Sequence, residues 1–574
     1  MTQSSHRSVR TLTAALILLA SHLCPGAALA QGAPDDPRAA RVDALFNELN
    51  RRDGPGAAVV VVRNGKVLLR RGYGLADLKH HVPVTPSTVF DTASLSKQFT
   101  GLAVAMLVTE GKIKLSDDIR KYIPKLPDTG RPVTVSQLLH HTSGVRDWGG
   151  TLSVAGWRPD DPITFKQILT MAYSQRSSNF VPGAEHLYSN TGYNLLAEMV
   201  QRVTGSSFRA WTDEHIFRPL GMNNTHVRDD YKEVIADRAS GYARAPDGSY
   251  RNTPDNLVAF GSSSVFSTAD DFARWLINFN GMAVGGRDAL AMMLEPATLN
   301  DGTLVNYGFG ITHGANRYKG LPFFTSSGEF ASFNCFDAYF PEQKFGVIVL
   351  ANTSESVISA QDAVIKITDI YLEKEFAATK PSDVPAPAPS RNVSLIPALL
   401  DQYAGVYRLG ADSFMRVQRL GTVLLSQIPH QGVVVMSPRS DREFWVEREE
   451  EGAAVSFLRD AAGKVTALEY RGQRAPKLNQ SDLRPPARLA DYAGDYDTEE
   501  LGTSYRVVVK NGALEMQHRR RGPVPLSWLW KDEFGSLDAY FGSVDFLRDA
   551  AGRVTGLVVN GSPRSRDLRF VKRQ

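Results

Sequence analysis

The chain has 574 residues, which is too long for a single small binding module and predicts more than one hydrophobic core. With 43% hydrophobic and 22% charged residues, its composition is typical of an ordinary globular protein and excludes a disordered or fibrous one. A formal charge of only +4 excludes the strongly basic surface of a nucleic-acid-binding protein, so we expect no nucleic-acid partner.

The first 30 residues have the pattern of an export signal. A positive start with Arg7 and Arg10 precedes an apolar run over residues 12–23, and Ala28-Leu29-Ala30 places small residues at the third and first positions before a cut. The run is too short for a membrane anchor. We expect cleavage after Ala30, which makes residues 1–30 a signal peptide and the protein exported, either to a periplasm or out of the cell.

The mature sequence predicts neither a membrane span nor a disulfide. No second stretch is apolar and long enough to span a bilayer, so we expect no transmembrane segment. Cys24 leaves with the signal, and Cys335 remains as the single cysteine of the mature chain. We therefore expect no intramolecular disulfide.

A β-hairpin is predicted near the start of the mature chain. Apolar runs at 57–62 and 67–71 flank Asn64-Gly65, and both central residues of such a turn need positive φ, which Asn and Gly accept.

Helices are predicted after this hairpin, and strands return later. Apolar residues recur at helical spacing over 99–107 and 195–203, and strands are expected at 330–340 and 345–350. We expect an α/β (α+β) domain over residues 35–375, with an antiparallel sheet and a helical cluster.

The last third of the chain repeats itself after a linker. Prolines separated by small residues predict an extended linker over 376–394. Beyond it, Tyr403-Ala404-Gly405 recurs as Tyr492-Ala493-Gly494, and Phe457–Gly463 recurs as Phe546–Gly552, both at the same displacement. We expect two small antiparallel all-β barrels or sandwiches, over residues 395–480 and 484–574.

Ser94-Leu95-Ser96-Lys97 is a candidate catalytic motif. Asp91 is suited to cap a helix that buries Phe99, which would place Ser94 in the first turn and Lys97 one turn on, along the same face. A lysine held in a cleft has a lowered pKa and accepts the proton of an attacking serine. The alternative is a capped surface helix with a solvated lysine.

Four segments in order resemble the serine β-lactamase and penicillin-binding protein superfamily, in its class C β-lactamase, esterase and D-aminopeptidase branch. Residues 90–100 are similar to its nucleophile segment, and residues 135–144 to its Leu-Leu-x-His-Thr-Ser-Gly signature. Residues 182–190 are similar to its Pro-Gly segment that ends in Tyr-x-Asn, and residues 340–352 to the strand pair that closes its sheet. The resemblance covers about residues 40–370.

The resemblance implies a role for each matched residue. Ser94 would be the acylated nucleophile, Lys97 the group that deprotonates it, and Tyr188 a proton shuttle. Asn190 would hold Lys97 and the substrate carbonyl side by hydrogen bonds. Tyr250-Arg251-Asn252 also fits Tyr-x-Asn, but it lies in a turn-rich stretch without the helix that follows Tyr188.

The third motif of the superfamily departs from its usual pattern. Relatives carry Lys or His, then Thr or Ser, then Gly, whereas the best match here is Ser326-Ser327-Gly328. Gly328 permits close approach of a substrate, and the N–H of Glu329 would join that of Ser94 in an oxyanion hole. The neutral Ser326 hydroxyl replaces a cation that would hold a substrate carboxylate. We therefore expect esters, or amides without a free acid beside the scissile bond, over β-lactams and D,D-carboxypeptidase substrates.

Two basic segments are weaker candidates. His140-His141 has no metal-ligand spacing around it, so we expect a structural role, no metal and no organic cofactor. His518-Arg519-Arg520-Arg521 is most simply a solvated loop; the alternative, favoured by the D-aminopeptidase resemblance, is that it leans over the catalytic cleft.

The sequence predicts an exported serine hydrolase that acts on a small-molecule or peptide substrate through an acyl-enzyme on Ser94. The alternative is a catalytically weak or inactive acyl- or peptide-binding protein of the same fold, motivated by Ser326. The four residues Ser94, Lys97, Tyr188 and Asn190 oppose that alternative, since a pure binder has no need of all of them. The sequence leaves the oligomeric state open.

Overall fold

The structure is a computed structural model that describes residues 36–573 except 51–52, 314–316, 355, 357, 379–394, 411–412, 429–430, 447–452, 480–485, 487 and 539. The expected signal peptide lies outside the described residues, as does most of the expected linker. Every helix in the described ranges is too short or too polar to cross a membrane.

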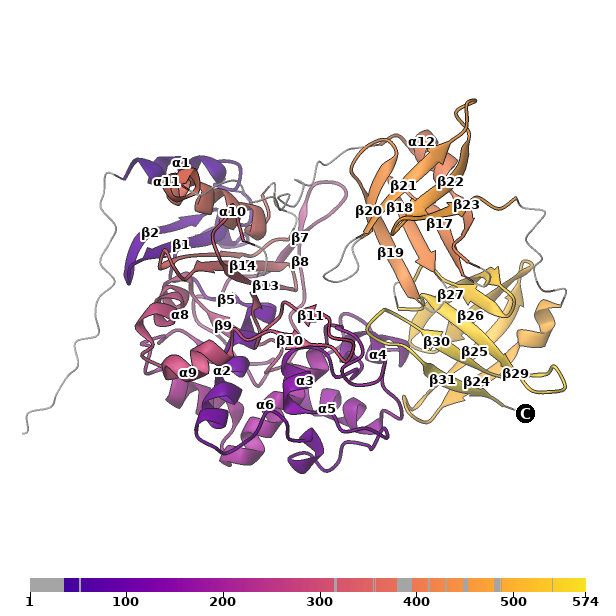
Figure 1. Ribbon diagram of the computed structural model, residues 1–574, viewed down its shortest axis with the longest axis horizontal. Helices are drawn as coiled ribbons and strands as arrows, with labels where there is room; N and C mark the ends of the chain where they lie inside the picture. The colour runs from indigo at the N-terminus through magenta and orange to yellow at the C-terminus, as the bar shows by residue number, and fades with distance from the viewer. Residues whose placement is uncertain are drawn as a thin grey trace, which may run out of the picture.

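A six-stranded antiparallel sheet forms the centre of the first part of the chain, in the order β12-β13-β14-β15-β1-β2 (Figure 1). Its strands are β1 Ala57–Arg63, β2 Lys66–Tyr73, β12 Thr312–His313, β13 Phe324–Phe330, β14 Phe333–Phe340 and β15 Phe345–Ala351. The predicted hairpin is confirmed as β1–β2, with Asn64 and Gly65 at φ values of 51° and 75°. The strand expected from Phe330 begins later, at Phe333, because Ala331 and Ser332 form the turn after β13.

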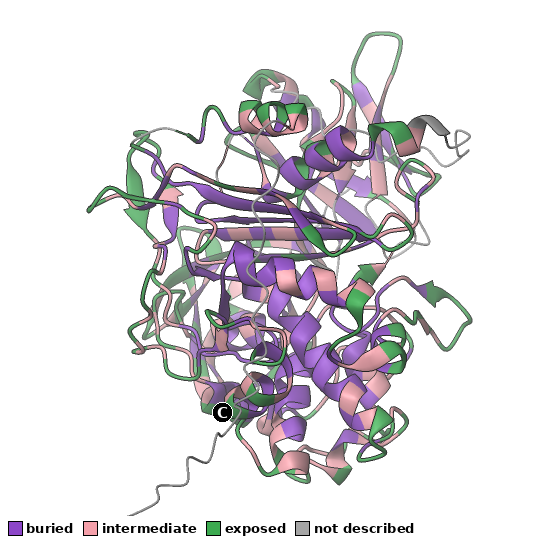
Figure 2. Ribbon diagram, turned by 90° about the vertical axis from the view of Figure 1, so that its left-hand side faces the viewer, coloured by how far each residue is buried: buried purple, intermediate pink, exposed green. Residues whose placement is uncertain are grey.

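Helices cover both faces of this sheet, which Figure 2 shows as buried strands between two helical layers. Alternate residues of β1 face opposite ways: Val59 and Val61 pack with α1 and α10, whereas Val60 and Val62 belong to the larger core around α2 and α8. The helices are α1 Pro37–Leu45, α2 Ser96–Thr109, α3 Val135–Leu139, α4 Trp148–Val154, α5 Phe165–Ser174, α6 Asn190–Thr204, α7 Phe208–Thr212, α8 Ala269–Gly281, α9 Gly286–Met292, α10 Ala360–Tyr371 and α11 Glu373–Ala378.

Shorter elements complete this part of the chain. The strands are β3 Leu75–Asp77, β4 Val82–Pro83, β5 Phe90–Asp91, β6 His226–Val227, β7 Tyr242–Arg244, β8 Tyr250–Asn252, β9 Val265–Ser267, β10 Ala297–Thr298 and β11 Leu304–Val305. Two short 3₁₀ helices are η1 Ala93–Leu95 and η2 Ile119–Lys121, and a short π-helix is η3 Asp213–Phe217.

Two all-β units follow, as the internal repeat predicted. The first is an eight-stranded sheet whose ends are joined by a bridge between Tyr407 and Lys477, and the second is a closed eight-stranded barrel. The first unit contains α12 Pro397–Tyr403, β16 Gly405–Arg408, β17 Phe414–Leu420, β18 Val423–Ile428, β19 Gln431–Pro438, β20 Glu443–Val446, β21 Ala453–Arg459, β22 Val465–Tyr470 and β23 Gln473–Pro476. The second contains η5 Leu489–Tyr492, β24 Gly494–Thr498, β25 Thr503–Lys510, β26 Ala513–His518, β27 Arg521–Trp530, β28 Glu533–Gly535, β29 Ser543–Arg548, β30 Val554–Asn560 and β31 Leu568–Lys572.

Equivalent tyrosines of the repeat make the same hydrogen bond in both units. Tyr407 donates a 2.6 Å hydrogen bond from its hydroxyl to the carbonyl of Tyr403, and Tyr496 donates one of the same length to Tyr492. These tyrosines are buried, so the bond satisfies a hydroxyl inside each core. The equal displacement between the repeated segments therefore reflects two units with one β architecture.

The second barrel packs against the end of α4 (Figure 1). Val154 is fully buried among the aromatic residues of the barrel core, and Tyr505 donates a 2.8 Å hydrogen bond to the Val154 carbonyl.

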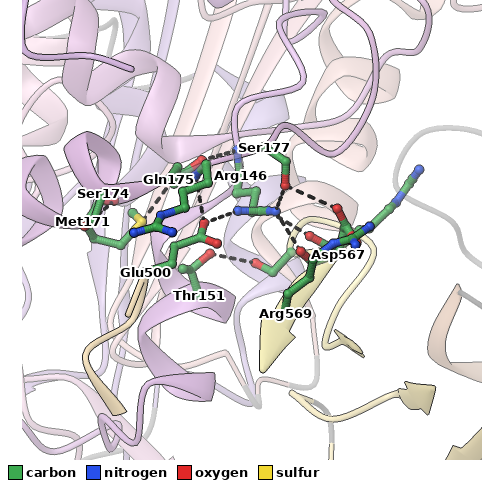
Figure 3. A network of polar contacts seen from close by, with 12 residues as sticks. Arg146, Thr151, Met171, Ser174, Gln175, Ser177, Glu500, Asp567 and Arg569 are labelled. Carbon is green, nitrogen blue, oxygen red and sulfur yellow. Dashed lines mark hydrogen bonds and ion pairs between the residues drawn. The ribbon is translucent and has the colours of Figure 1, made fainter. Parts of the chain in front are cut away.

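Buried Arg146 ties the same two parts together, as Figure 3 shows. Its guanidinium pairs with Glu500 and donates to the carbonyls of Arg566 at 2.7 Å and Asp567 at 2.9 Å. Burial lowers the pKa of Arg146.

Candidate active site

Ser94 lies in the tight turn η1 just before α2, and not in the first turn of α2 as the sequence suggested. Asp91 accepts a 2.8 Å hydrogen bond from the Ala93 N–H and so fixes the turn without capping α2 itself. Ala93 has a φ of 48°, an unfavourable conformation for a residue with a Cβ, immediately before the candidate nucleophile. The half-buried Ser94 side chain remains reachable from solvent.

Lys97 is fully enclosed, and its ammonium group is aimed at Ser94. Nζ donates to Ser94 Oγ at 3.0 Å and to Asn190 Oδ1 at 2.8 Å, and its third bond goes to the Ser262 carbonyl at 2.8 Å. Burial lowers the pKa of Lys97 well below its ordinary value, while the Asp147 carboxylate raises this pKa and the Arg564 guanidinium lowers it. In the neutral form that this lowered pKa favours, Nζ keeps two N–H donors for Asn190 Oδ1 and the Ser262 carbonyl, and its lone pair faces Ser94 Oγ, ready to accept the hydroxyl proton.

Tyr188 joins the same group from a distant part of the chain. Its hydroxyl donates a 2.8 Å hydrogen bond to Ser94 Oγ, and Lys97 Nζ lies 4.6 Å from its ring centroid. The rival Tyr250 lies on β8 with an exposed side chain.

The buried His141 ring supports Tyr188 at 4.3 Å between centroids and accepts a 3.1 Å hydrogen bond from the Ser189 N–H at Nδ1. His141 therefore positions the Tyr188 segment. Among the described residues, no group of three or more His, Cys, Asp or Glu side chains is arranged to hold a metal ion.

Asn190 is placed by Asp147, a residue that the sequence reasoning missed. The Asp147 Oδ2 atom accepts a 2.6 Å hydrogen bond from the Asn190 N–H at the start of α6. The spacing of Asp147 and Asn190 in the sequence does not predict this contact, because it joins the starts of two separate helices, α4 and α6.

Strand β13 forms a wall beside Ser94. A Cβ on Gly328 would lie 2.3 Å from the Thr92 carbonyl oxygen and 2.9 Å from the Ser94 nitrogen, so only glycine fits there. Ser326 is buried, donating from Oγ to the Gly310 carbonyl at 3.2 Å, whereas Ser327 is exposed.

The N–H of Glu329 faces the free edge of β13. Ala331 and Ser332 form a two-residue turn with positive φ at both positions, so Phe330 and Phe333 are the hydrogen-bonded pair that closes the hairpin. Pairs alternate along antiparallel strands, and the N–H of Glu329, one position away, therefore points away from β14. Strand β12 covers this edge only at Phe324 and Thr325.

A loop of the second barrel, residues 561–567, also reaches this cleft. The Arg564 guanidinium carbon lies 4.6 Å from the centroid of the Tyr188 ring. The Arg564 carbonyl accepts from the Asp147 N–H and from Asn179 Nδ2, both at 2.9 Å, and so fixes the loop. Sequence analysis did not single out Arg564, because one arginine in a turn carries no local signal.

The His518–Arg521 segment is not the simple solvated loop that we expected. The His518 ring packs against Gly156, and Arg520 pairs with Asp161 at 2.6 Å. These contacts bind the barrel to the segment after α4, while the 561–567 loop is the one that meets Tyr188.

Comparisons with known proteins agree with this arrangement. The model of the family described as Beta-lactamase matches residues 42–370. The chain is 27% identical over 419 residues to "Penicillin-binding protein 4*" of Bacillus subtilis (strain 168), covering 70% of this chain and 90% of that protein. It is 25% identical over 471 residues to "D-aminopeptidase" of Gluconobacter oxydans (strain 621H), covering 81% and 84%.

A solved structure shares the fold as well. The octameric penicillin-binding protein homologue from Pyrococcus abyssi superposes with a TM-score of 0.54 at 23% identity, over 76% of this chain and 99% of that chain.

Proposed function

The chain belongs to the Beta-lactamase family, and from this premise we propose that it is an exported serine hydrolase that cleaves ester or amide bonds through an acyl-enzyme on Ser94. The observation that carries the proposal is the hydrogen-bonded set around Ser94 Oγ, with Lys97 Nζ at 3.0 Å and the Tyr188 hydroxyl at 2.8 Å. A nucleophile with two groups able to take and return its proton is the arrangement that acyl transfer needs.

The first step forms the acyl-enzyme. Neutral Lys97 takes the proton of Ser94 as Oγ attacks the carbonyl carbon, and the carbonyl oxygen becomes an oxyanion held by the N–H groups of Ser94 and Glu329. The intermediate collapses when the leaving group departs with a proton delivered from Lys97 through the Tyr188 hydroxyl.

The second step releases the acid. Water attacks the ester carbonyl while its proton passes through the Tyr188 hydroxyl to neutral Lys97, and the same oxyanion forms. The intermediate collapses when Lys97 returns that proton to Ser94 Oγ, which leaves as the free hydroxyl. Asn190 Oδ1 keeps Lys97 oriented through both steps, and Asp147 fixes Asn190.

The substrate proposal follows from position 326. A neutral buried Ser326 does not provide the charge-assisted bond that a lysine would offer a carboxylate along β13. We propose esters and amides, including D-aminoacyl amides, over β-lactams and peptides with a D-alanyl-D-alanine end. A carboxylate on the substrate would have to pair with Arg564, which lies against the Tyr188 ring, instead of with a cation on β13.

The test is covalent labelling of the mature chain, residues 31–574. A fluorophosphonate probe should add one adduct in the intact mass, and the adduct should map to Ser94 and be lost in Ser94→Ala. An unlabelled wild-type protein would favour the binding-protein alternative. A panel of p-nitrophenyl esters, D-aminoacyl anilides and a chromogenic cephalosporin then ranks substrates, and rapid cephalosporin turnover would contradict the reasoning from Ser326.

Export is tested separately. Expression of the full chain should yield a protein whose N-terminal residue is Gln31, recovered from the periplasm or the medium. A protein that keeps residues 1–30 in the cytoplasm would contradict this part of the proposal.

A further inference from the structure

A pocket of about 190 Å³ lies where α4, the β13–β14 hairpin and the second barrel meet. Its walls are mainly aromatic and aliphatic: Trp148, Leu152, Trp157, Leu257, Phe330 and Tyr540. Tyr540 comes from the barrel, so the complete pocket exists only when the barrel is docked.

Two of its walls adjoin the groups that flank the reacting bond. Trp148 directly follows Asp147, which binds the Asn190 N–H, and Phe330 comes two residues after Gly328, so it shares the face of β13 that meets Ser94. The pocket therefore stands beside the cleft, on the side where β13 ends.

The size and lining of the pocket suit an aromatic ring. An apolar cavity of about 150 Å³ is large enough to bind benzene. Trp148 is only 9% exposed, so its ring is a buried part of the pocket wall.

Two charged residues, Arg158 and Asp161, also line the pocket. Asp161 pairs with Arg520 of the barrel at 2.6 Å, so its charge is partnered. The Arg520 guanidinium carbon lies 5.5 Å from the centroid of the Trp157 ring. The Arg520–Asp161 pair thus joins the barrel to the aromatic wall.

We propose that this pocket binds an aromatic or bulky aliphatic side chain on the acyl part of the substrate, an inference that rests on the proposed serine hydrolase function. The leaving group departs before water attacks, whereas the acyl part stays on Ser94 through both steps. A pocket that encloses a side chain from several directions is therefore suited to the acyl part. The barrel thereby takes part in substrate selection through Tyr540.

The test compares two esters with the same leaving group, p-nitrophenyl acetate and p-nitrophenyl 3-phenylpropanoate. Burial of the phenyl ring should raise kcat/KM for the second ester about tenfold to hundredfold over the first. Leu152→Trp, which fills the pocket, and Tyr540→Ala, which removes one wall, should each lower this ratio about tenfold.

Leu537→Ala is the matched control, because Leu537 is an exposed residue of the same barrel loop. It should keep the wild-type ratio. Fluorophosphonate labelling of each variant separates the two levels of the proposal. If wild type is not labelled, the hydrolase function is wrong. If it is labelled but the ratio is near one, or Tyr540→Ala leaves a high ratio intact in a folded protein, the pocket assignment is wrong.

Discussion

The guanidinium carbon of Arg564 lies 4.6 Å from the ring centroid of Tyr188. Tyr188 in turn donates to Ser94 Oγ, so a positive charge from the last loop of the second barrel stands beside the candidate proton-transfer group. The barrel is therefore part of the electrostatic environment of the nucleophile.

Arg564→Gln should shift the pH dependence of acylation. Lys97 accepts a proton only when it is neutral, and the Arg564 charge contributes to its lowered pKa, after burial. Removing that charge raises the pKa of Lys97, so the acidic limb of kcat/KM should move to higher pH and the rate at neutral pH should fall.

The matched control is Arg569→Gln, which removes an exposed arginine that follows the 561–567 loop and pairs with Asp567. It should leave the acidic limb in place. An acidic limb that moves equally in both variants would show a general effect of net charge instead of a local effect of Arg564.

Tyr188→Phe should lower the acylation rate about 10²- to 10⁴-fold, the usual contribution of a general acid–base group. The ring would still pack on His141, so the fold should be preserved and the loss should appear in kcat with little change in thermal unfolding. Single-turnover release of p-nitroaniline from a D-aminoacyl p-nitroanilide measures it, because an amine leaving group needs the proton that Tyr188 delivers. Tyr250→Phe, on the exposed strand β8, is the control that should retain the wild-type rate.

Local patterns predicted much of the fold, because the signals are short in range. Asn64-Gly65 specified the hairpin, and the equal displacement of two sequence segments predicted two β units of one architecture. The family motifs likewise selected Ser94, Lys97, Tyr188 and Asn190, whose side chains lie together.

The remaining parts of the site depend on contacts between distant segments. Asp147 at the start of α4 meets Asn190 at the start of α6, Ser262 contacts Lys97 through a backbone carbonyl, and Arg564 comes from the second barrel. No spacing in the sequence encodes such contacts. For the same reason the sequence misjudged the His518–Arg521 segment, which packs against α4 and its following loop.

Gly328→Ala should inactivate the enzyme without unfolding it. The new Cβ would meet the Thr92 carbonyl at 2.3 Å and the Ser94 nitrogen at 2.9 Å, so β13 must shift away from the nucleophile. Displacing one oxyanion donor costs about 10²- to 10³-fold in kcat, which the ester assay would detect. Gly281→Ala, where a Cβ meets nothing within 4 Å, should keep full activity.

Arg146→Met should undock the barrel and weaken catalysis together. The Arg146 side chain is fully buried and Glu500 is 7% exposed, so removing the cation leaves a carboxylate enclosed without its partner, at a cost of about 3–5 kcal/mol. The variant also loses the bonds to the carbonyls of Arg566 and Asp567, which belong to the loop that carries Arg564 toward Tyr188. We expect a lower unfolding midpoint, faster proteolysis between the domains, and an acidic limb displaced in the same direction as in Arg564→Gln.

The double variant Arg146→Met with Glu500→Gln separates charge burial from loss of packing. It should recover part of the lost stability, because the unpaired buried carboxylate of Glu500 is gone. It should not recover the wild-type pH profile, because the carbonyls of Arg566 and Asp567 still lack the Arg146 donor. Arg41→Met provides the comparison, since Arg41 and Glu373 form an exposed pair whose loss should cost at most about 1 kcal/mol. If Arg146→Met proved as mild as Arg41→Met, the buried pair could not be what holds the barrel against the catalytic domain, and the path from Arg146 to Arg564 would have no energetic basis.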